Sequence, residues 1–151
     1  MDSKAATFTA FIDWLNHSAI VYFIPWGYEE LPFHLSGGDV DLYVHPKQYA
    51  TVTRELLRRG YAQSQCPASH DHAQFAQAGY HSIDLFSSFC FSFEGKTTLL
   101  HIDANHLIQG RTKRGMLWIA SPVVELLFTA LRVVGGRTDC ITRLKKFLEV
   151  R

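Results

Sequence analysis

Apolar residues near the start of the chain recur with helical spacing. The residues at the i, i+3, i+4 and i+7 positions are Phe8, Phe11, Ile12 and Leu15. They predict an amphipathic helix over about residues 4–17. Residues 19–24 are, apart from Ala19, β-branched or aromatic and end at Pro25, which predicts a short buried strand. Residues 39–44 alternate polar and apolar side chains and predict a second strand.

The remainder of the chain mixes strand and helix patterns. Pro46 suits a first helical position, and an apolar stripe predicts a helix from there to about Gly60. Further segments of strand character are residues 61–65, 73–78, 82–93 and 97–103. Ser121 and Pro122 predict the N-cap and first residue of a helix, and Thr138 predicts the cap of a last one. This order predicts an α+β fold, a small mixed β-sheet backed by helices, with C-terminal helices.

Length and composition indicate one folded domain. The chain has 151 residues, of which 47% are hydrophobic and 19% charged, and this suits a single domain with its own core. We expect residues 1–151 to form one domain, with an α/β core over about residues 1–110 and a helical segment over about residues 121–151.

Net charge and apolar runs restrict the partners and the location of the protein. The net charge of +1 gives no overall field to attract nucleic acid. No apolar run approaches the roughly 20 residues that span a bilayer, and the N-terminus lacks a signal segment. The cysteines, Cys66, Cys90 and Cys140, have no C-x-x-C spacing and suit buried thiols in a reducing compartment. We therefore expect a cytoplasmic protein without a membrane span or a nucleic-acid partner.

Two carboxylates lie close together at the start of the predicted strand over residues 39–44. Asp39 and Asp41 are two residues apart, so their side chains share one face of that strand. Two ionised carboxylates side by side repel, and a core does not require them. A divalent cation between the two carboxylates would offset their repulsion, since Mg²⁺ is bound by a few carboxylate oxygens together with phosphate oxygens. Gly37 and Gly38, directly before the strand, let the backbone approach a ligand closely.

A third acid on a neighbouring strand would complete such a site. Asp84 lies between Ile83 and Leu85, so on a strand it points away from two buried residues. Three carboxylates on adjacent strands can bind two divalent ions about 3.5–4 Å apart. Asp103 has a similar context and is the competing third acid. Asp84 is preferred because its segment has the stronger strand composition and lies nearer to the pair in the sequence.

These residues carry a resemblance to a known family. The segment Asp39-Val40-Asp41-Leu42, with a glycine turn before it and a later strand acid, resembles the nucleotidyltransferase superfamily of the DNA polymerase β type. In that family an apolar residue, Gly, and then Gly or Ser stand about ten residues upstream. Here Gly27 follows a predicted strand at that distance, and Tyr28 replaces the small residue. Residues 22–44 also resemble uncharacterised nucleotidyltransferase-like proteins associated with bacterial surface-polysaccharide genes.

The resemblance implies a mixed sheet backed by helices and a metal-dependent reaction. It implies that an NMP moves from an NTP to a hydroxyl of a small molecule or glycan precursor, with Mg²⁺ (or Mn²⁺) as cofactor. Asp39, Asp41 and Asp84 would be the catalytic and metal-binding residues, and Asp84 would help to deprotonate the acceptor. The candidate nucleotide-binding residues are Gly27, Tyr28, Ser36, Gly37, Gly38, Arg111 and Lys113. Arg111 and Lys113 belong to a basic turn that suits either a phosphate clamp or a solvated loop.

Other interpretations remain open from the sequence. His70 and His72 have a spacing that zinc can use, but their Pro- and Ser-containing surroundings favour a polar loop. Tyr28, and the short segment left for a nucleotide-holding helical domain, fit a catalytically inactive binding or regulatory module instead of an enzyme. Such a chain would complete its site by forming a homodimer or with a partner domain. Because D-x-D is a short motif, a metal-dependent sugar or phosphate transferase of another fold is a further alternative.

Overall fold

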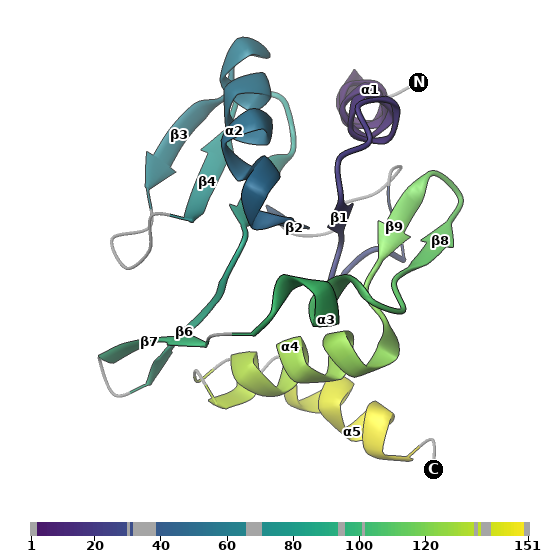
Figure 1. Cartoon of the computed structure of the whole chain (residues 1–151), viewed down its shortest axis with the longest axis vertical. Helices are drawn as coiled ribbons and strands as arrows, with labels where there is room; N and C mark the ends of the chain where they lie inside the picture. The colour runs from purple at the N-terminus through teal and green to yellow at the C-terminus, as the bar shows by residue number, and fades with distance from the viewer. Residues whose placement is uncertain are drawn as a thin grey trace.

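The computed structural model describes residues 3–29, 31, 39–65, 71–93, 96–100, 102–134, 136 and 140–149. Within them lie the helices α1 (Ser3–His17), α2 (Tyr49–Arg58), α3 (Ala104–Ile108), α4 (Pro122–Val134) and α5 (Ile141–Glu149). The strands are β1 (Tyr22–Phe23), β2 (Asp39–Val44), β3 (Ala62–Gln65), β4 (His72–Ala76), β5 (Ser82–Phe86), β6 (Phe89–Phe93), β7 (Lys96–Leu100), β8 (Thr112–Arg114) and β9 (Leu117–Ile119) (Figure 1). The predicted α+β class is confirmed.

A five-stranded sheet organises the fold. Its strand order is β1-β2-β5-β4-β3. Strands β2 and β5 run parallel, and the other neighbouring pairs run antiparallel, so the sheet is mixed as predicted. Two separate hairpins, β6-β7 and β8-β9, flank this sheet.

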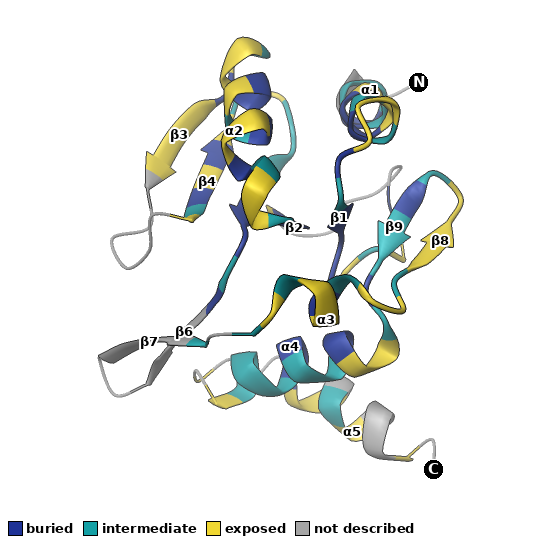
Figure 2. Cartoon of the chain, viewed as in Figure 1, coloured by how far each residue is buried: buried dark blue, intermediate teal, exposed yellow. Residues whose placement is uncertain are grey.

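Each face of the sheet packs against its own apolar cluster. On one face, Val40 and Leu42 of β2 are buried with apolar residues of α1 and α2, such as Phe11 and Val52. On the other face, Tyr43 is buried with residues of α3 and α4 in a second cluster. Figures 1 and 2 show α3, α4 and α5 well separated from α1 and α2, with the buried strands between the two groups. The face of β2 that carries Tyr43 is also the face of Asp39 and Asp41.

Two predicted helix starts are confirmed by their local geometry. The Val124 amide donates to the Ser121 hydroxyl at 3.3 Å, and Pro122 is the first residue of α4. Pro46 begins a 3₁₀ turn over Pro46–Gln48 that leads directly into α2. Gly60 follows that helix with φ +89°, a conformation that favours glycine after a helix C-terminus. The predicted cap Thr138 lies outside the described residues.

Several predicted strands have different bounds in the structure. Residues 82–93 were predicted as one segment, but they form β5 and β6, which belong to different sheets. The predicted strand over residues 97–103 ends at Leu100, and Asp103 caps α3 by accepting from the Asn105 amide at 2.8 Å. The predicted turn around Lys113 is part of the β8-β9 hairpin. Apolar composition reports strand character but not a change of pairing partner, so these boundaries depend on tertiary packing.

None of the helices in the described part of the chain combines the length and the apolar character needed to cross a membrane.

Removing a core side chain behind the acids should destabilise the fold. Leu42 is 1% exposed and points away from Asp41 into the first cluster. We expect Leu42→Ala to lower the free energy of unfolding by about 2–5 kcal/mol in urea denaturation, because it leaves a cavity in that cluster. In the same measurement Val123→Ala, at a site 76% exposed, should change the free energy by no more than about 0.5 kcal/mol. Equal effects of the two substitutions would contradict this assignment of the core.

Candidate active site

The carboxylates singled out in the sequence lie on adjacent parallel strands. In the β2-β5 register, Asp41 stands directly opposite Asp84, and Asp39 stands opposite Ser82. Because paired residues of neighbouring strands point to the same face, Asp39, Asp41 and Asp84 lie on one face of the sheet. The strand pairing on which the choice of Asp84 depended is therefore present. Asp103, the alternative third acid, lies on no strand and uses its carboxylate as a helix cap.

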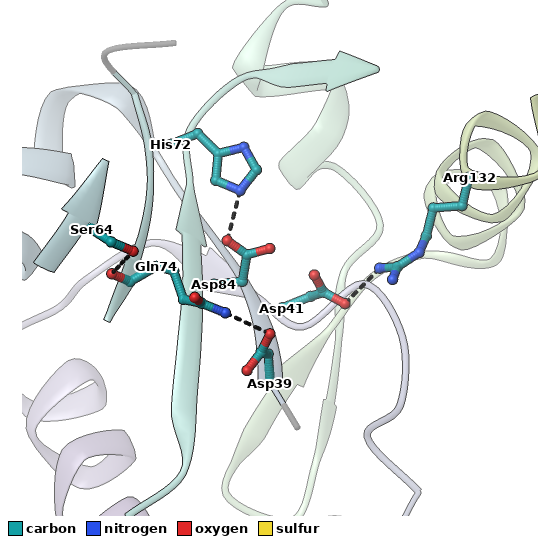
Figure 3. Close-up of polar contacts among 7 residues, drawn as sticks. All are labelled: Asp39, Asp41, Ser64, His72, Gln74, Asp84 and Arg132. Atoms are coloured by element: carbon teal, nitrogen blue, oxygen red, sulfur yellow. Dashed lines mark hydrogen bonds and ion pairs between the residues drawn. The ribbon is translucent and has the colours of Figure 1, made fainter. Parts of the chain in front are cut away.

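Each of the three carboxylates is held by a different donor (Figure 3). The Gln74 side-chain amide donates to Asp39 Oδ2 at 2.7 Å. The His72 Nε2 atom lies 2.6 Å from Asp84 Oδ1. The Arg132 Nη1 atom donates to Asp41 Oδ2 at 2.8 Å. Strand β4 thus supplies two of the donors and helix α4 supplies the third.

Asp41 is the most deeply buried of these acids. It is 8% exposed, and desolvation raises its pKa from the ordinary value of 3.8 to about 6. Arg132 opposes this rise in pKa through its charge and its hydrogen bond, whereas the neighbouring Asp84 and Asp39 add to it. A buried carboxylate with two acidic neighbours would be stabilised by a further cation.

The three acids fit a magnesium site by their chemistry. Carboxylate oxygens are ligands that Mg²⁺ and Mn²⁺ prefer. Among the residues that the structure describes, no group of three His, Cys, Asp or Glu side chains is arranged to hold a metal ion. The carboxylates instead point to Gln74, His72 and Arg132.

The raised pKa of Asp41 predicts a pH-dependent stability. The folded state binds this proton more tightly than the unfolded state, so the stabilising contribution is complete below about pH 4 and is lost as the pH rises through about 6. Without divalent cations, we expect the free energy of unfolding of the wild type, relative to Asp41→Asn, to fall by up to about 3 kcal/mol over this interval. Urea unfolding of both proteins in a chelator between pH 4 and 8 measures this difference. A difference that stays constant with pH would contradict the prediction.

The residues predicted to bind the nucleotide lie in several environments. Gly27 has φ +71°, a backbone conformation that favours glycine, and among the described residues no atom beyond its chain neighbours lies within 4 Å of the place of a Cβ. The Tyr28 hydroxyl donates to Glu125 Oε2 of α4 at 2.9 Å. Ser36, Gly37 and Gly38 lie outside the described residues.

The two basic residues predicted to bind phosphate differ in their contacts. Arg111 donates to the Tyr22 carbonyl oxygen at 2.9 Å, and its guanidinium lies 4.4 Å from the Trp118 ring centroid. It therefore ties the β8-β9 hairpin to β1. Lys113 is exposed on β8. Their predicted role in nucleotide binding stays a prediction.

Three residues beside the acids were not identified in the sequence as parts of the site. His72 and Gln74 lie on β4, and their strand pairs with β5 so that Gln74 faces Asp84. Their alternation with the buried Ala73 and Phe75 is typical of a strand with one polar face, whereas the Pro- and Ser-containing sequence before His72 predicts a loop; that prediction is wrong for His72, which begins β4. The partner of His72 is a carboxylate, and His70 lies outside the described residues. No local pattern distinguished Arg132 from other polar residues on α4.

Comparison with known proteins supports the fold. No protein-family model and no curated protein sequence matches the chain. The solved structures with similar folds include the following three. The lincosamide antibiotic adenylyltransferase LnuA, bound to lincomycin, is 14% identical with a TM-score of 0.55, and the match covers 94% of this chain and 97% of LnuA. The antibiotic-resistance factor ANT(2'')-Ia is 10% identical with a TM-score of 0.56, covering 99% of this chain and 90% of that protein.

The third structure is a Thermotoga maritima protein described as a nucleotidyltransferase. It is 13% identical with a TM-score of 0.55, and the match covers 97% of this chain and 92% of that protein. All three matches extend over almost the whole of both chains. The chain therefore has a nucleotidyltransferase-like fold, as the sequence resemblance implied.

Proposed function

We propose that this chain is a metal-dependent nucleotidyltransferase that transfers an NMP from an NTP to a hydroxyl of a small molecule or glycan precursor. The observation that carries the proposal is the register of Asp41 with Asp84, which brings the D-x-D pair and a third acid to one face of the sheet. The fold is one that nucleotidyltransferases have. It gives no support to a sugar or phosphate transferase of another fold.

The structural neighbours favour a small-molecule acceptor. LnuA is a lincosamide antibiotic adenylyltransferase and was solved with lincomycin, and ANT(2'')-Ia is an antibiotic-resistance factor. The net charge of +1 also favours a small acceptor over a nucleic acid.

In this proposal the three acids have two roles. Asp39 and Asp41 hold Mg²⁺ or Mn²⁺, which when bound stabilises the charge that develops on the phosphate oxygens. Asp84 accepts the proton of the acceptor hydroxyl, and His72, 2.6 Å from Asp84, orients that carboxylate. The acceptor oxygen forms a bond to the α-phosphorus. The bond between the α-phosphorus and the oxygen that bridges it to the β-phosphorus breaks. Pyrophosphate leaves with that electron pair.

A transfer assay tests this function. Each of the four α-labelled NTPs is incubated with the protein, Mg²⁺ and a panel of hydroxyl-bearing antibiotics and sugar precursors, and labelled product and pyrophosphate are measured together. We expect product and pyrophosphate in equal amounts from the wild type and neither from the Asp39→Asn/Asp41→Asn double variant. Pyrophosphate release that persists in the double variant would contradict the assignment of the site.

One contact favours a second candidate function, a catalytically inactive binding module. Tyr28 fills the position of the family's small residue, and its hydroxyl is bonded to Glu125 on α4. This contact connects the loop after β1 to the C-terminal helices. An inactive module would bind Mg²⁺-NTP in calorimetry yet transfer no NMP to any acceptor in the assay above.

A further inference from the structure

Arg132 of α4 joins the acidic strand to the loop that carries Gly27. Its guanidinium donates to Asp41 Oδ2 at 2.8 Å. The same guanidinium lies 4.7 Å from the ring centroid of Trp26, the residue before Gly27, and 5.3 Å from that of Phe128. Figure 3 shows the side chain reaching from α4 toward Asp41. The positive charge of Arg132 thus lies between the proposed metal ligand Asp41 and the loop that carries Gly27, a candidate nucleotide-binding residue.

One buried donor of the Arg132 guanidinium has no acceptor among the described residues. Arginine carries five N–H donors in a planar fork. Its Nε is buried and has no hydrogen-bond partner among the described residues, while Nη1 bonds to Asp41. The aromatic contacts restrict the guanidinium without using its N–H groups. Because Nε is enclosed by protein here, it can meet an anion only when the side chain moves, and a guanidinium released from Asp41 would present its planar fork to phosphate oxygens, which match it.

Arg132 forms an ion pair with Asp41, which is also one of the two proposed metal ligands. The Arg132 side chain is 21% exposed and that of Asp41 is 10% exposed, so solvent screens this pair only in part. A divalent cation on Asp41 would repel a guanidinium that stays at hydrogen-bond distance. Nucleotide phosphates beside Asp41 would offer Arg132 a replacement for the carboxylate it gives up.

We propose that Arg132 exchanges partners, pairing with Asp41 in the free protein and with the phosphates of a metal-bound nucleoside triphosphate in the complex. This inference rests on the proposed function and adds a phosphate-positioning residue from α4 to it. Its signature is a pair of opposite effects. Removing the guanidinium should strengthen the binding of the metal alone and weaken the binding of the metal-bound triphosphate.

The test compares Arg132→Met and Arg132→Lys with Arg54→Met at pH 8. Arg54 is exposed on α2 and matches the loss of one positive charge away from the site. The metal probe is Mn²⁺ alone, followed by electron paramagnetic resonance. The phosphate probe is Mg²⁺-tripolyphosphate in calorimetry, which needs no knowledge of the base.

Arg132→Met is expected to bind Mn²⁺ at least about tenfold more tightly, because a charge directly on the carboxylate is removed. It should bind Mg²⁺-tripolyphosphate at least about tenfold more weakly, because a charged hydrogen bond is lost. Arg132→Lys should recover part of the tripolyphosphate affinity, and Arg54→Met should match the wild type. Trp26 fluorescence should change when the wild type binds tripolyphosphate, and Trp26→Phe should remove that signal.

Two results would overturn the inference while leaving the proposed function intact. In the first, Arg132→Met binds both Mn²⁺ and Mg²⁺-tripolyphosphate more weakly, which would make Arg132 a structural support of Asp41. In the second, Arg132→Met binds both probes as tightly as the wild type. A wild type that binds neither Mn²⁺ nor Mg²⁺-tripolyphosphate would instead contradict the proposed function itself.

Discussion

Asp41→Asn is expected to lose measurable Mn²⁺ binding and to reduce NMP transfer by about 10³-fold or more. A divalent cation contributes several kcal/mol to stabilising phosphoryl transfer, and each ~1.4 kcal/mol corresponds to a tenfold change in rate. Asparagine keeps the size of the side chain but supplies only a neutral carbonyl oxygen. Since Asp41 is the most buried of the three acids, solvent cannot readily replace it as a ligand.

Calorimetry with Mn²⁺ and the transfer assay measure the two effects of this substitution. Asp13→Asn is the matched control, because Asp13 is exposed on α1 and undergoes the same chemical change. Circular dichroism should show that both variants keep the fold. If Asp41→Asn bound Mn²⁺ as tightly as the wild type, Asp41 would not be a metal ligand, and the proposed site would be wrong.

Asp84→Asn is expected to lower kcat by about 10²–10⁴-fold, the contribution typical of a general base. Its effect on Mn²⁺ affinity should be smaller than that of Asp41→Asn, because Asp39 and Asp41 remain. The reason for choosing Asp84 is its position opposite Asp41 on the parallel strand and the contact of its carboxylate with His72.

Asp103→Asn gives a precise control for this prediction. Asp103 was the competing third acid in the sequence, and in the structure its carboxylate accepts from the Asn105 amide at the start of α3. Asparagine caps helices about as well as aspartate, so this variant should leave the free energy of unfolding nearly unchanged. Its kcat should stay within about twofold of the wild-type value. A large loss of kcat in Asp103→Asn, with Asp84→Asn unaffected, would reverse the assignment of the third acid.

Donors from β4 and α4 contact all three acids of the site. Gln74, His72 and Arg132 each contact one carboxylate of this face. This arrangement reduces the repulsion that three adjacent carboxylates would otherwise experience. It also means that metal affinity depends on the strength of these donors as well as on the acids.

Local patterns in the sequence were sufficient to predict most elements of the fold. Phe8, Phe11 and Leu15, which have helical spacing, lie in α1, and Ser121 caps α4 as predicted. The patterns were insufficient where a strand changes its neighbours. Ser87 and Ser88 separate β5 from β6, and Phe89 joins the second cluster beside Phe128, although the composition of residues 82–93 predicts one strand segment. Strand propensity depends on such packing contacts, which are made by residues far apart in the chain.

The sequence by itself determined that Asp39 and Asp41 share a face, because side chains alternate along any strand. It also favoured Asp84 over Asp103 by strand composition. Only the tertiary structure decided that Asp84 stands opposite Asp41, since register is a property of two paired strands. Only the tertiary structure brought Arg132 to Asp41 across 91 positions of the sequence, because α4 packs on the acidic face of the sheet.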